Sequence, residues 1–271
     1  MKFELFKSSE TFKSLRSFGT SKTFGNSETT GTFRTSTIIE INLMSTKKHI
    51  VVLTGAGISA ESGLKTFRDS DGLWMGHNIE DVATPRAFNR NPQLVLEFYN
   101  MRRKDVAAAE PNAAHKAIAA LESDYAVTIV TQNIDDLHER AGSSNVLHLH
   151  GEIFKMRSVE NDGLVSEIRG DIQLGDLAAD GAQLRPHIVW FEEAVPMIEP
   201  AARIMQLADI FILVGTSLQV YPAAGLINYV RSEVPKFIID KKIPPVGQYA
   251  NLHLIEKSAT EGMEALREML K

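Results

Sequence analysis

The most informative absence in this 271-residue sequence is cysteine, of which there is none. A chain without cysteine forms no disulfide, has no thiol nucleophile and cannot bind a metal through thiolates. No apolar run reaches the roughly 18–20 residues that a membrane-spanning helix needs. Excess positive charge is also absent: the formal net charge is -5, which disfavours a nucleic-acid-binding protein. We expect a cytoplasmic protein, monomeric, that binds neither nucleic acid nor membrane.

Branched aliphatic residues are scarce in residues 1–37, where fragments such as SETFKS and SETTGTF repeat Ser, Thr, Phe, Lys and Gly. This composition can bury too little apolar surface to offset the chain entropy lost on ordering. Met44 then opens the text MSTKKHIVVLTGAG, which reads as a natural start. We interpret residues 1–45 as a disordered tail or as upstream translation that precedes the true start.

From His49 onward, the sequence alternates short apolar runs with helical patterns. The expected strands are 49–54, 126–131, 146–150, 209–215, 235–240 and 251–256. Helix start signals lie between them, because Thr84 and Asn91 each precede a proline and Thr260 precedes a terminal helix. Strands that alternate with helices predict an α/β fold with a Rossmann-like, doubly wound parallel sheet.

Two stretches interrupt this alternation. Residues 69–108 are predicted to be helical after a loop rich in Asp and Gly, and residues 151–187 contain the strand-like texts IFKMRSV and LVSEIRG. We interpret these stretches as a small inserted domain. The larger domain then consists of 46–68, 109–150 and 188–271, and a cleft between the two is the natural place for a site.

Two glycine turns are expected at the carboxyl ends of strands. The first contains Gly55 and Gly57, where the lack of side chains lets backbone N–H groups approach a pyrophosphate. It departs from the dinucleotide-binding fingerprint because Ala60 stands where the third glycine would be. A plain tight turn between strand and helix therefore remains an alternative. The second turn begins at Gly215, followed by Thr216.

Polar side chains follow two further predicted strands. Gln132, Asn133 and Asp135 could bind an amide or a ribose, although an Asp helix cap is the alternative reading of the carboxylate. His148 and His150 would point to one face of a strand, so a metal pair is conceivable, but no well-placed third ligand accompanies them. A histidine beside a glycine at a strand end, as at His150, is better explained as a general base.

In order and spacing, these segments resemble the sirtuins. The similar texts are GAGISAESGLKTFR (55–68), TQNIDDLH (131–138), LHLHG (147–151), LRPHIVWF (184–191) and VGTSLQVYPAA (214–224). The resemblance implies a transferase that uses NAD to remove acyl groups from lysines of protein substrates, giving nicotinamide and O-acyl-ADP-ribose. Two alternatives remain. One is a mono-ADP-ribosyltransferase or NAD glycohydrolase, and the other is a non-catalytic module that binds NAD or ADP-ribose.

The resemblance also implies roles for individual residues. His150 is expected to be the base, with Asn133 and Asp135 as the other catalytic residues. The residues expected to contact NAD are Gly55, Ala56, Gly57, Phe67, Arg68, Gln132, Asn133, Asp135, Gly215, Thr216, Ser217, Asp240 and Ala259. Phe67 would shield the reacting ribose carbon, and Asp240 stands where the family commonly has an asparagine.

One predicted helix, residues 92–108, indicates which acyl group is removed. Tyr99 and Arg102 share a face beside an apolar stripe. The stripe consists of Leu94, Phe98 and Met101. On spacing alone, a solvated arginine and an edge tyrosine would explain the pair. The text EFYNMRR, however, resembles the Tyr-x-x-Arg element of the sirtuin branch that prefers succinyl-, malonyl- and glutaryl-lysine. The expected substrate-binding residues are Tyr99, Arg102, Ala83 and Phe191.

The sequence departs from the family in two places. Sirtuins typically carry two cysteine pairs that hold a structural zinc, but here Ser158, Asn161 and Asp180 lie near the expected ligand positions, and neutral hydroxyl and amide groups are poor ligands of Zn²⁺. We expect no metal and a small domain held by its own packing. The second departure is in residues 190–193, where Glu192 replaces a glycine in the segment that normally pairs with the substrate backbone.

Overall fold

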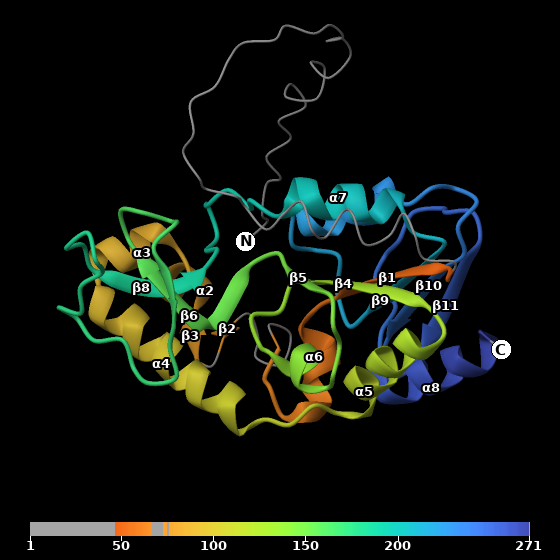
Figure 1. Cartoon of the computed structure of the whole chain (residues 1–271), viewed down its shortest axis with the longest axis horizontal. Helices are drawn as coiled ribbons and strands as arrows, with labels where there is room; N and C mark the ends of the chain where they lie inside the picture. The colour runs from red at the N-terminus through yellow and green to blue at the C-terminus, as the bar shows by residue number, and fades with distance from the viewer. Residues whose placement is uncertain (1–46, 67–72, 75, 271) are drawn as a thin grey trace, which may run out of the picture. The chain divides into compact units, whose positions relative to one another are not determined.

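A six-stranded parallel sheet is the largest layer of the computed structural model, which describes residues 47–66, 73–74 and 76–270 (Figure 1). Its strands are β1 (His49–Thr54), β4 (Ala126–Thr131), β5 (Val146–His148), β9 (Ile210–Val214), β10 (Lys236–Asp240) and β11 (Leu252–Glu256). Their spatial order is β11-β10-β9-β1-β4-β5, and every neighbouring pair is parallel. The predicted doubly wound parallel sheet is thereby confirmed.

The order of the strands reverses at β1. Strands β4 and β5 follow β1 in the chain and lie on one side of it within the sheet. The chain then returns and adds β9, β10 and β11 on the other side of β1. Parallel α/β sheets place ligand sites beside the carboxyl ends of the strands at such a reversal. A ligand site is therefore expected at the turns that follow β1 and β9.

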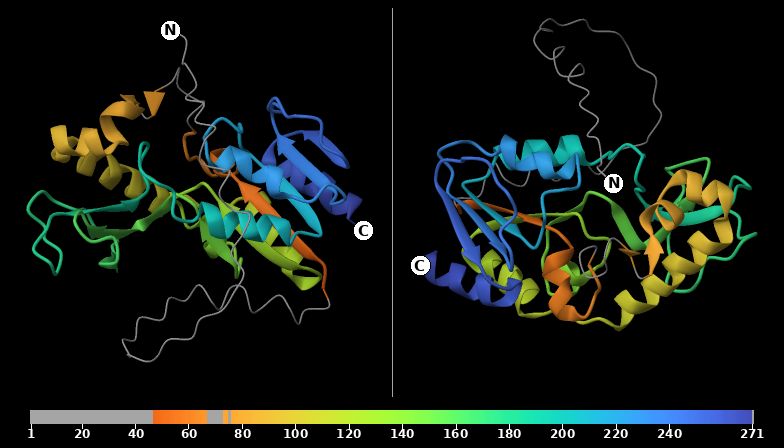
Figure 2. Two further views of the ribbon diagram at one scale, coloured as in Figure 1. Left: turned by 90° about the horizontal axis from the view of Figure 1, so that it is seen from above. Right: turned by 180° about the vertical axis from the view of Figure 1, so that it is seen from behind.

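Helices cover both faces of the sheet (Figure 1, and from behind in Figure 2). They are α5 (Ala113–Ala120), α7 (Ile198–Gln206), η4 (Ala223–Tyr229) and α8 (Ala259–Met269). Val51 and Leu53 of β1 pack in one core with α7 and η4, whereas Ile50 and Val52 pack in another with α5 and α8. Because both faces are buried along β1, β4 and β9, these strands read as nearly continuous apolar runs.

Two helices begin at the side chains that the sequence indicates. Thr84 Oγ1 accepts a hydrogen bond from Ala87 N at 3.0 Å and begins α3 (Pro85–Arg90). Asn91 Oδ1 accepts from Leu94 N at 3.1 Å and begins α4 (Pro92–Ala108). No helix in the part of the chain that the structure describes is long and apolar enough to span a membrane.

The predicted start of the last helix at Thr260 is wrong. Ser258 is the N-cap of α8, and its Oγ accepts from Glu261 N at 3.4 Å. Thr260 instead donates from its backbone N and its Oγ1 to the carboxylate of Glu61, at 3.0 and 2.7 Å. A serine followed three residues later by a glutamate is a typical helix start, and this signal favours Ser258.

A second layer is built from segments 73–108 and 151–188. Besides α3 and α4, it contains β2 (Leu73–Trp74), β3 (His77–Asn78), α2 (Ile79–Val82), β6 (Gly151–Ser158), β7 (Val165–Glu167) and β8 (Leu184–Ile188). The last three form an antiparallel sheet in the order β7-β6-β8. One compact unit contains all the described residues, so the division into two domains stays a prediction.

The buried face of α4 differs from the predicted stripe. Met101 is 39% exposed, whereas Arg102 and Arg103 are 7% and 1% exposed. Arg103 donates to Ile153 O at 2.9 Å and to Gly170 O at 3.1 Å. Carbonyl groups far along the chain thus accept from two nitrogens of a buried guanidinium, whose Nη2 has no hydrogen-bond partner among the described residues. The helical spacing of apolar residues carries no sign of this.

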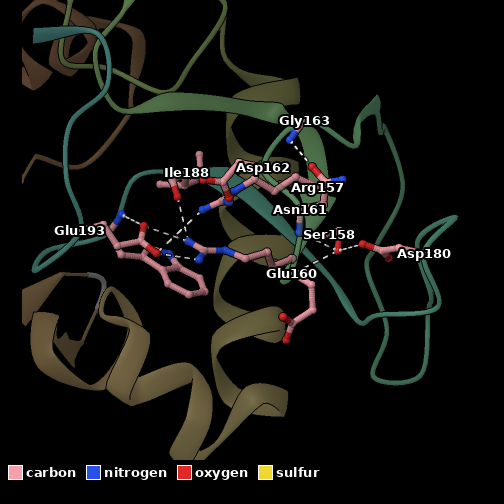
Figure 3. A network of polar contacts seen from close by, with 11 residues as sticks. Arg157, Ser158, Glu160, Asn161, Asp162, Gly163, Asp180, Ile188 and Glu193 are labelled. Carbon is pink, nitrogen blue, oxygen red and sulfur yellow. Dashed lines mark hydrogen bonds and ion pairs between the residues drawn. The ribbon is translucent and has the colours of Figure 1, made fainter.

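The positions near the expected zinc ligands are joined by hydrogen bonds (Figure 3). Ser158 Oγ donates to Asp180 Oδ2 at 2.7 Å and accepts from Glu160 N at 3.0 Å and Asn161 N at 3.3 Å. Asn161 Oδ1 accepts from Gly163 N at 2.9 Å. Within the described ranges, no group of three or more His, Asp or Glu could hold a metal ion. Polar contacts therefore hold together this end of β6.

Candidate active site

A cleft of about 420 Å³ contains the predicted site residues at the carboxyl ends of the parallel strands. The predicted residues that line it are Gly55, Ala56, Gly57, Ala83, Tyr99, Arg102, Gln132, Asn133, Asp135, His150, Phe191, Gly215, Thr216, Ser217, Asp240 and Ala259. Phe67 and Arg68 lie outside the described residues. The fold thus brings together side chains from strands and helices that are far apart in the sequence.

The glycine turns after β1 and β9 pack directly against each other. Gly55 N donates to Val214 O at 3.1 Å, and Gly57 N donates to Gly215 O at 2.8 Å. A Cβ on Gly57 would lie 2.6 Å from Gly215 Cα, and Gly215 itself has a φ of 63°. Glycine is needed at both positions, because a side chain would clash at one and strain the backbone at the other.

These turns fit the phosphate-bearing part of NAD. The N–H groups of Gly55 and Gly57 already donate to Val214 O and Gly215 O. The hydroxyls of Thr216 and Ser217 are therefore the donors offered at this part of the cleft, beside the bare glycine backbone. Backbone N–H groups and hydroxyls are the neutral donors that phosphate oxygens accept from. Asp240, at the end of β10, also lines the cleft and is able to accept from a ribose hydroxyl.

Ser59 joins Asn133 and Asp135 in a buried hydrogen-bonded chain. Asn133 Nδ2 donates to Ser59 Oγ at 3.1 Å, and Ser59 Oγ donates to Asp135 Oδ2 at 3.1 Å. The other carboxylate oxygen of Asp135 accepts from Leu137 N at 3.2 Å, beside the start of α6 (Leu137–Arg140). Burial raises the pKa of Asp135, although these hydrogen bonds oppose the rise. The N-cap residue of α6 is Asp136, whose side chain makes no capping hydrogen bond, so Asp135 instead connects the first residue of α6 to Ser59.

Ser59 and His115 are residues of this network for which the sequence predicted no role. His115 Nε2 lies 3.5 Å from Ser59 Oγ, and burial lowers the pKa of His115 to about 4. Both side chains are buried, at 1% and 0% exposure. Ser59 lies within the glycine-rich text, where a serine reads as an ordinary turn residue, and His115 lies on α5, where helical spacing shows only a buried position.

One backbone carbonyl fixes the tautomer of His150. Its Nδ1 lies 3.0 Å from Gln132 O. Because a carbonyl only accepts, Nδ1 carries the proton, which leaves Nε2 of the neutral ring able to take one up. Burial lowers the pKa of His150, so the ring is neutral near pH 7. These are the properties that a general base needs.

His148 makes separate hydrogen bonds and does not pair with His150. Its Nδ1 bonds to Asn133 O at 3.0 Å and its Nε2 to Glu139 Oε1 at 2.8 Å. Burial alone would lower the pKa of His148, but the hydrogen bond and the charge of Glu139 together raise it. Both of its nitrogens are therefore engaged within the protein, which leaves none to complete a histidine metal pair.

Helix α4 contributes Tyr99 and Arg102 to the cleft lining, and both are buried, at 1% and 7% exposure. Arg102 Nη2 donates to Lys65 O at 3.3 Å, and the guanidinium carbon lies 5.8 Å from the centre of the Trp74 ring. Arg102 Nε is buried and has no hydrogen-bond partner among the residues that the structure describes. Burial lowers the pKa of Arg102. The cleft thus contains a buried cation with unused donor capacity.

Comparison with known proteins identifies the family of the chain. The Sir2 family profile matches residues 55–222. An NAD-dependent protein deacylase of Bacteroides thetaiotaomicron is 49% identical over 229 residues, which cover 82% of this chain and 98% of the relative. An NAD-dependent protein deacylase of Helicobacter pylori (strain 26695) is 52% identical over 223 residues, covering 82% and 97%.

Solved structures give the same result. A Sir2 homologue in complex with NAD has a TM-score of 0.73 at 37% identity and covers 88% of this chain and 94% of its own. An ADP-ribose complex of a mutant Sir2 homologue has a TM-score of 0.75 at 38% identity, covering 87% and 96%. The chain therefore belongs to the Sir2 family and is an NAD-dependent protein deacylase.

Proposed function

We propose that the protein removes succinyl and malonyl groups from protein lysines more efficiently than acetyl groups, and that it releases nicotinamide and O-acyl-ADP-ribose. The observation that carries this proposal is the buried Arg102, whose Nε has no hydrogen-bond partner among the described residues. The charges of Asp135 and Asp105 offset part of the cost of burying this cation, but neither forms an ion pair with Arg102 among the described residues. A carboxylate that enters with the substrate would supply a direct partner.

A carboxylate at the end of the acyl chain suits Arg102 better than a methyl group does. A guanidinium can donate two parallel hydrogen bonds to one carboxylate, and each charge-assisted bond contributes roughly 1.5–3 kcal/mol. Burial raises the pKa of Tyr99 far above neutrality, so its phenol keeps the proton and can act as a third donor. Ala83, which is 2% exposed, adds only a methyl group to the cleft lining and leaves room for a longer acyl chain.

The remaining site residues have roles that follow from their surroundings. When bound, NAD supplies the ribose carbon that receives the acyl oxygen and the nicotinamide that leaves. The Asn133 amide and the Asp135 carboxylate are oriented by Ser59 and would bind nicotinamide and its ribose. His150, neutral and unprotonated at Nε2, would accept a proton from a ribose hydroxyl.

The experiment is a mass-spectrometric comparison of one peptide sequence that carries acetyl-, malonyl-, succinyl- or glutaryl-lysine, each incubated with the full chain and NAD. The proposal predicts higher kcat/KM for the acidic acyl groups and the appearance of free lysine with the matching O-acyl-ADP-ribose. Transfer of ADP-ribose to protein, or release of nicotinamide without deacylation, would support the alternative reactions instead. A higher kcat/KM for acetyl-lysine would contradict the proposed acyl preference.

A further inference from the structure

Glu192 adopts a backbone conformation that normally belongs to glycine. Its φ is 76°, in the left-handed region, where a residue with a Cβ is strained. The residue lies in segment 190–193 and lines the cleft. Strain at one residue beside a binding cleft calls for a functional reason, because a glycine would relieve it.

The Glu192 carboxylate forms a two-point ion pair with Arg86 on α3. Arg86 Nε donates to Oε2 at 3.1 Å and Arg86 Nη2 donates to Oε1 at 2.5 Å. The neighbouring backbone is also fixed, since Phe191 N donates to Ala83 O at 3.0 Å. The carboxylate is therefore held at a defined place next to the cleft, with one cation beside it.

Stability does not explain a charged residue at this position. The side chains of Arg86 and Glu192 are 74% and 41% exposed, and exposed ion pairs contribute little to the free energy of unfolding. The adjacent Glu193 differs, because it pairs at 2.7 Å with Arg185, whose side chain is 7% exposed and stacks on Trp190. Glu193 thus holds the segment together, whereas Glu192 presents its charge to solvent at the cleft.

We propose that Glu192 is a specificity-determining residue that favours protein substrates with basic side chains next to the acyl-lysine, and that Arg86 moderates this preference by partly neutralising the carboxylate. This inference rests on the proposed function only in that the acylated peptide enters this cleft. An accessible carboxylate at the rim of a binding site attracts cationic side chains and repels anionic ones. Glu192 lines the cleft, so its charge should dominate the effect on the peptide.

The test measures kcat/KM of the full chain on two otherwise identical peptides, in which the residues on both sides of the acyl-lysine are either Arg or Asp. Each peptide is made in an acetyl and a succinyl form. The ratio between Arg- and Asp-flanked peptides tests the present inference, and the ratio between acyl forms at fixed flanks tests the proposed function. Either ratio can therefore fail without the other.

The expected wild-type ratio of Arg- to Asp-flanked peptide is about 3–10 at low ionic strength, and it should shrink as salt screens the charges. Glu192→Gln and Glu192→Gly should both bring the ratio close to one. Arg86→Gln should raise it, because the carboxylate then loses its neutralising partner. Arg203→Gln removes the same charge from an exposed pair on α7 and should leave the ratio unchanged.

Glu192→Gln should lower the ratio and Arg86→Gln should raise it, and these opposite changes distinguish selection by charge from an ion pair that only holds segment 190–193 in place. If Arg86 and Glu192 only fix the segment, Arg86→Gln and Glu192→Gln would lower activity on all peptides to a similar extent and leave the ratio as it was. That result, or a wild-type ratio near one, would overturn the inference.

Discussion

Ser158 Oγ donates a 2.7 Å hydrogen bond to Asp180 Oδ2 and so connects the end of β6 to the turn that precedes β8. Both residues lie near the positions at which the resemblance to sirtuins implies zinc ligands. At the same end of β6, Arg157 forms ion pairs with Asp162 and, at 3.8 Å, with Glu193 (Figure 3). Polar interactions therefore run from the end of β6 to segment 190–193, which lines the cleft.

Replacing Ser158 with alanine should destabilise the fold. The side chain is fully buried, and the substitution leaves the backbone N–H groups of Glu160 and Asn161 without their acceptor. Because both hydrogen bonds are part-buried, their loss should cost roughly 0.5–1.5 kcal/mol of unfolding free energy. Denaturant unfolding measures the change, with the exposed Ser232→Ala as control, for which a change within about 0.5 kcal/mol is expected. Equal stability of the two variants would contradict the role given to Ser158.

Metal removal should have no effect on the enzyme. The chain has no cysteine, and Ser158, Asn161 and Asp180 hydrogen-bond to one another or to nearby backbone. Deacylation and melting temperature are expected to be unchanged after dialysis against a strong chelator, and elemental analysis should find no stoichiometric zinc. One zinc per chain, or loss of activity that zinc restores, would show that another set of ligands binds the metal.

His150→Tyr should abolish most deacylation and spare the fold. Loss of a general base lowers turnover by about 10²–10⁴-fold. NAD binding, followed by calorimetry, and the melting temperature should change little, because the substitution removes a single hydrogen bond to Gln132 O. A folded variant with near-normal turnover would rule out His150 as the base.

The pH dependence of kcat/KM should have an acidic limb with its midpoint below 6.5. Burial lowers the pKa of His150 from that value, and the protonated ring cannot accept a proton, so activity should fall as the pH decreases through the shifted pKa. A midpoint above 6.5 in folded protein would contradict this assignment.

Acid unfolding has to be separated from this effect. The pKa of His115 is lowered from 6.5 to about 4, so the unfolded chain takes up a proton there at higher pH than the folded chain does. The stabilising contribution of a neutral His115 is therefore complete above a pH of 6.5 and declines as the pH falls toward 4. Circular dichroism at each pH gives the control.

Much of the fold could be predicted from the sequence because buried parallel strands leave a local signal. The runs at β1 and β4 are continuous and apolar, and the structure has both strands at their predicted bounds. Turn chemistry is equally visible at Thr84 and Asn91, whose side chains cap α3 and α4.

Interactions between distant segments could not be predicted in this way. Helical spacing indicates that Met101 is buried, yet it is Arg103 that is buried, because Ile153 O and Gly170 O accept its hydrogen bonds. The part played by Ser59 likewise depends on Asn133, which lies 74 residues further along the chain.

The measurement that tests the account most directly is kcat/KM on succinyl- and acetyl-lysine versions of one peptide, for the wild type, Arg102→Met and Arg102→Lys. The wild type should prefer the succinyl peptide. Arg102→Met should lose mainly desuccinylation, by about tenfold or more, since it removes at least one charge-assisted hydrogen bond. Arg102→Lys keeps the charge without the two-point geometry, so its kcat/KM on the succinyl peptide should lie between those of the wild type and Arg102→Met. A wild-type preference for acetyl-lysine, or an equal loss of both activities in Arg102→Met, would contradict the account and leave only the general deacylase assignment.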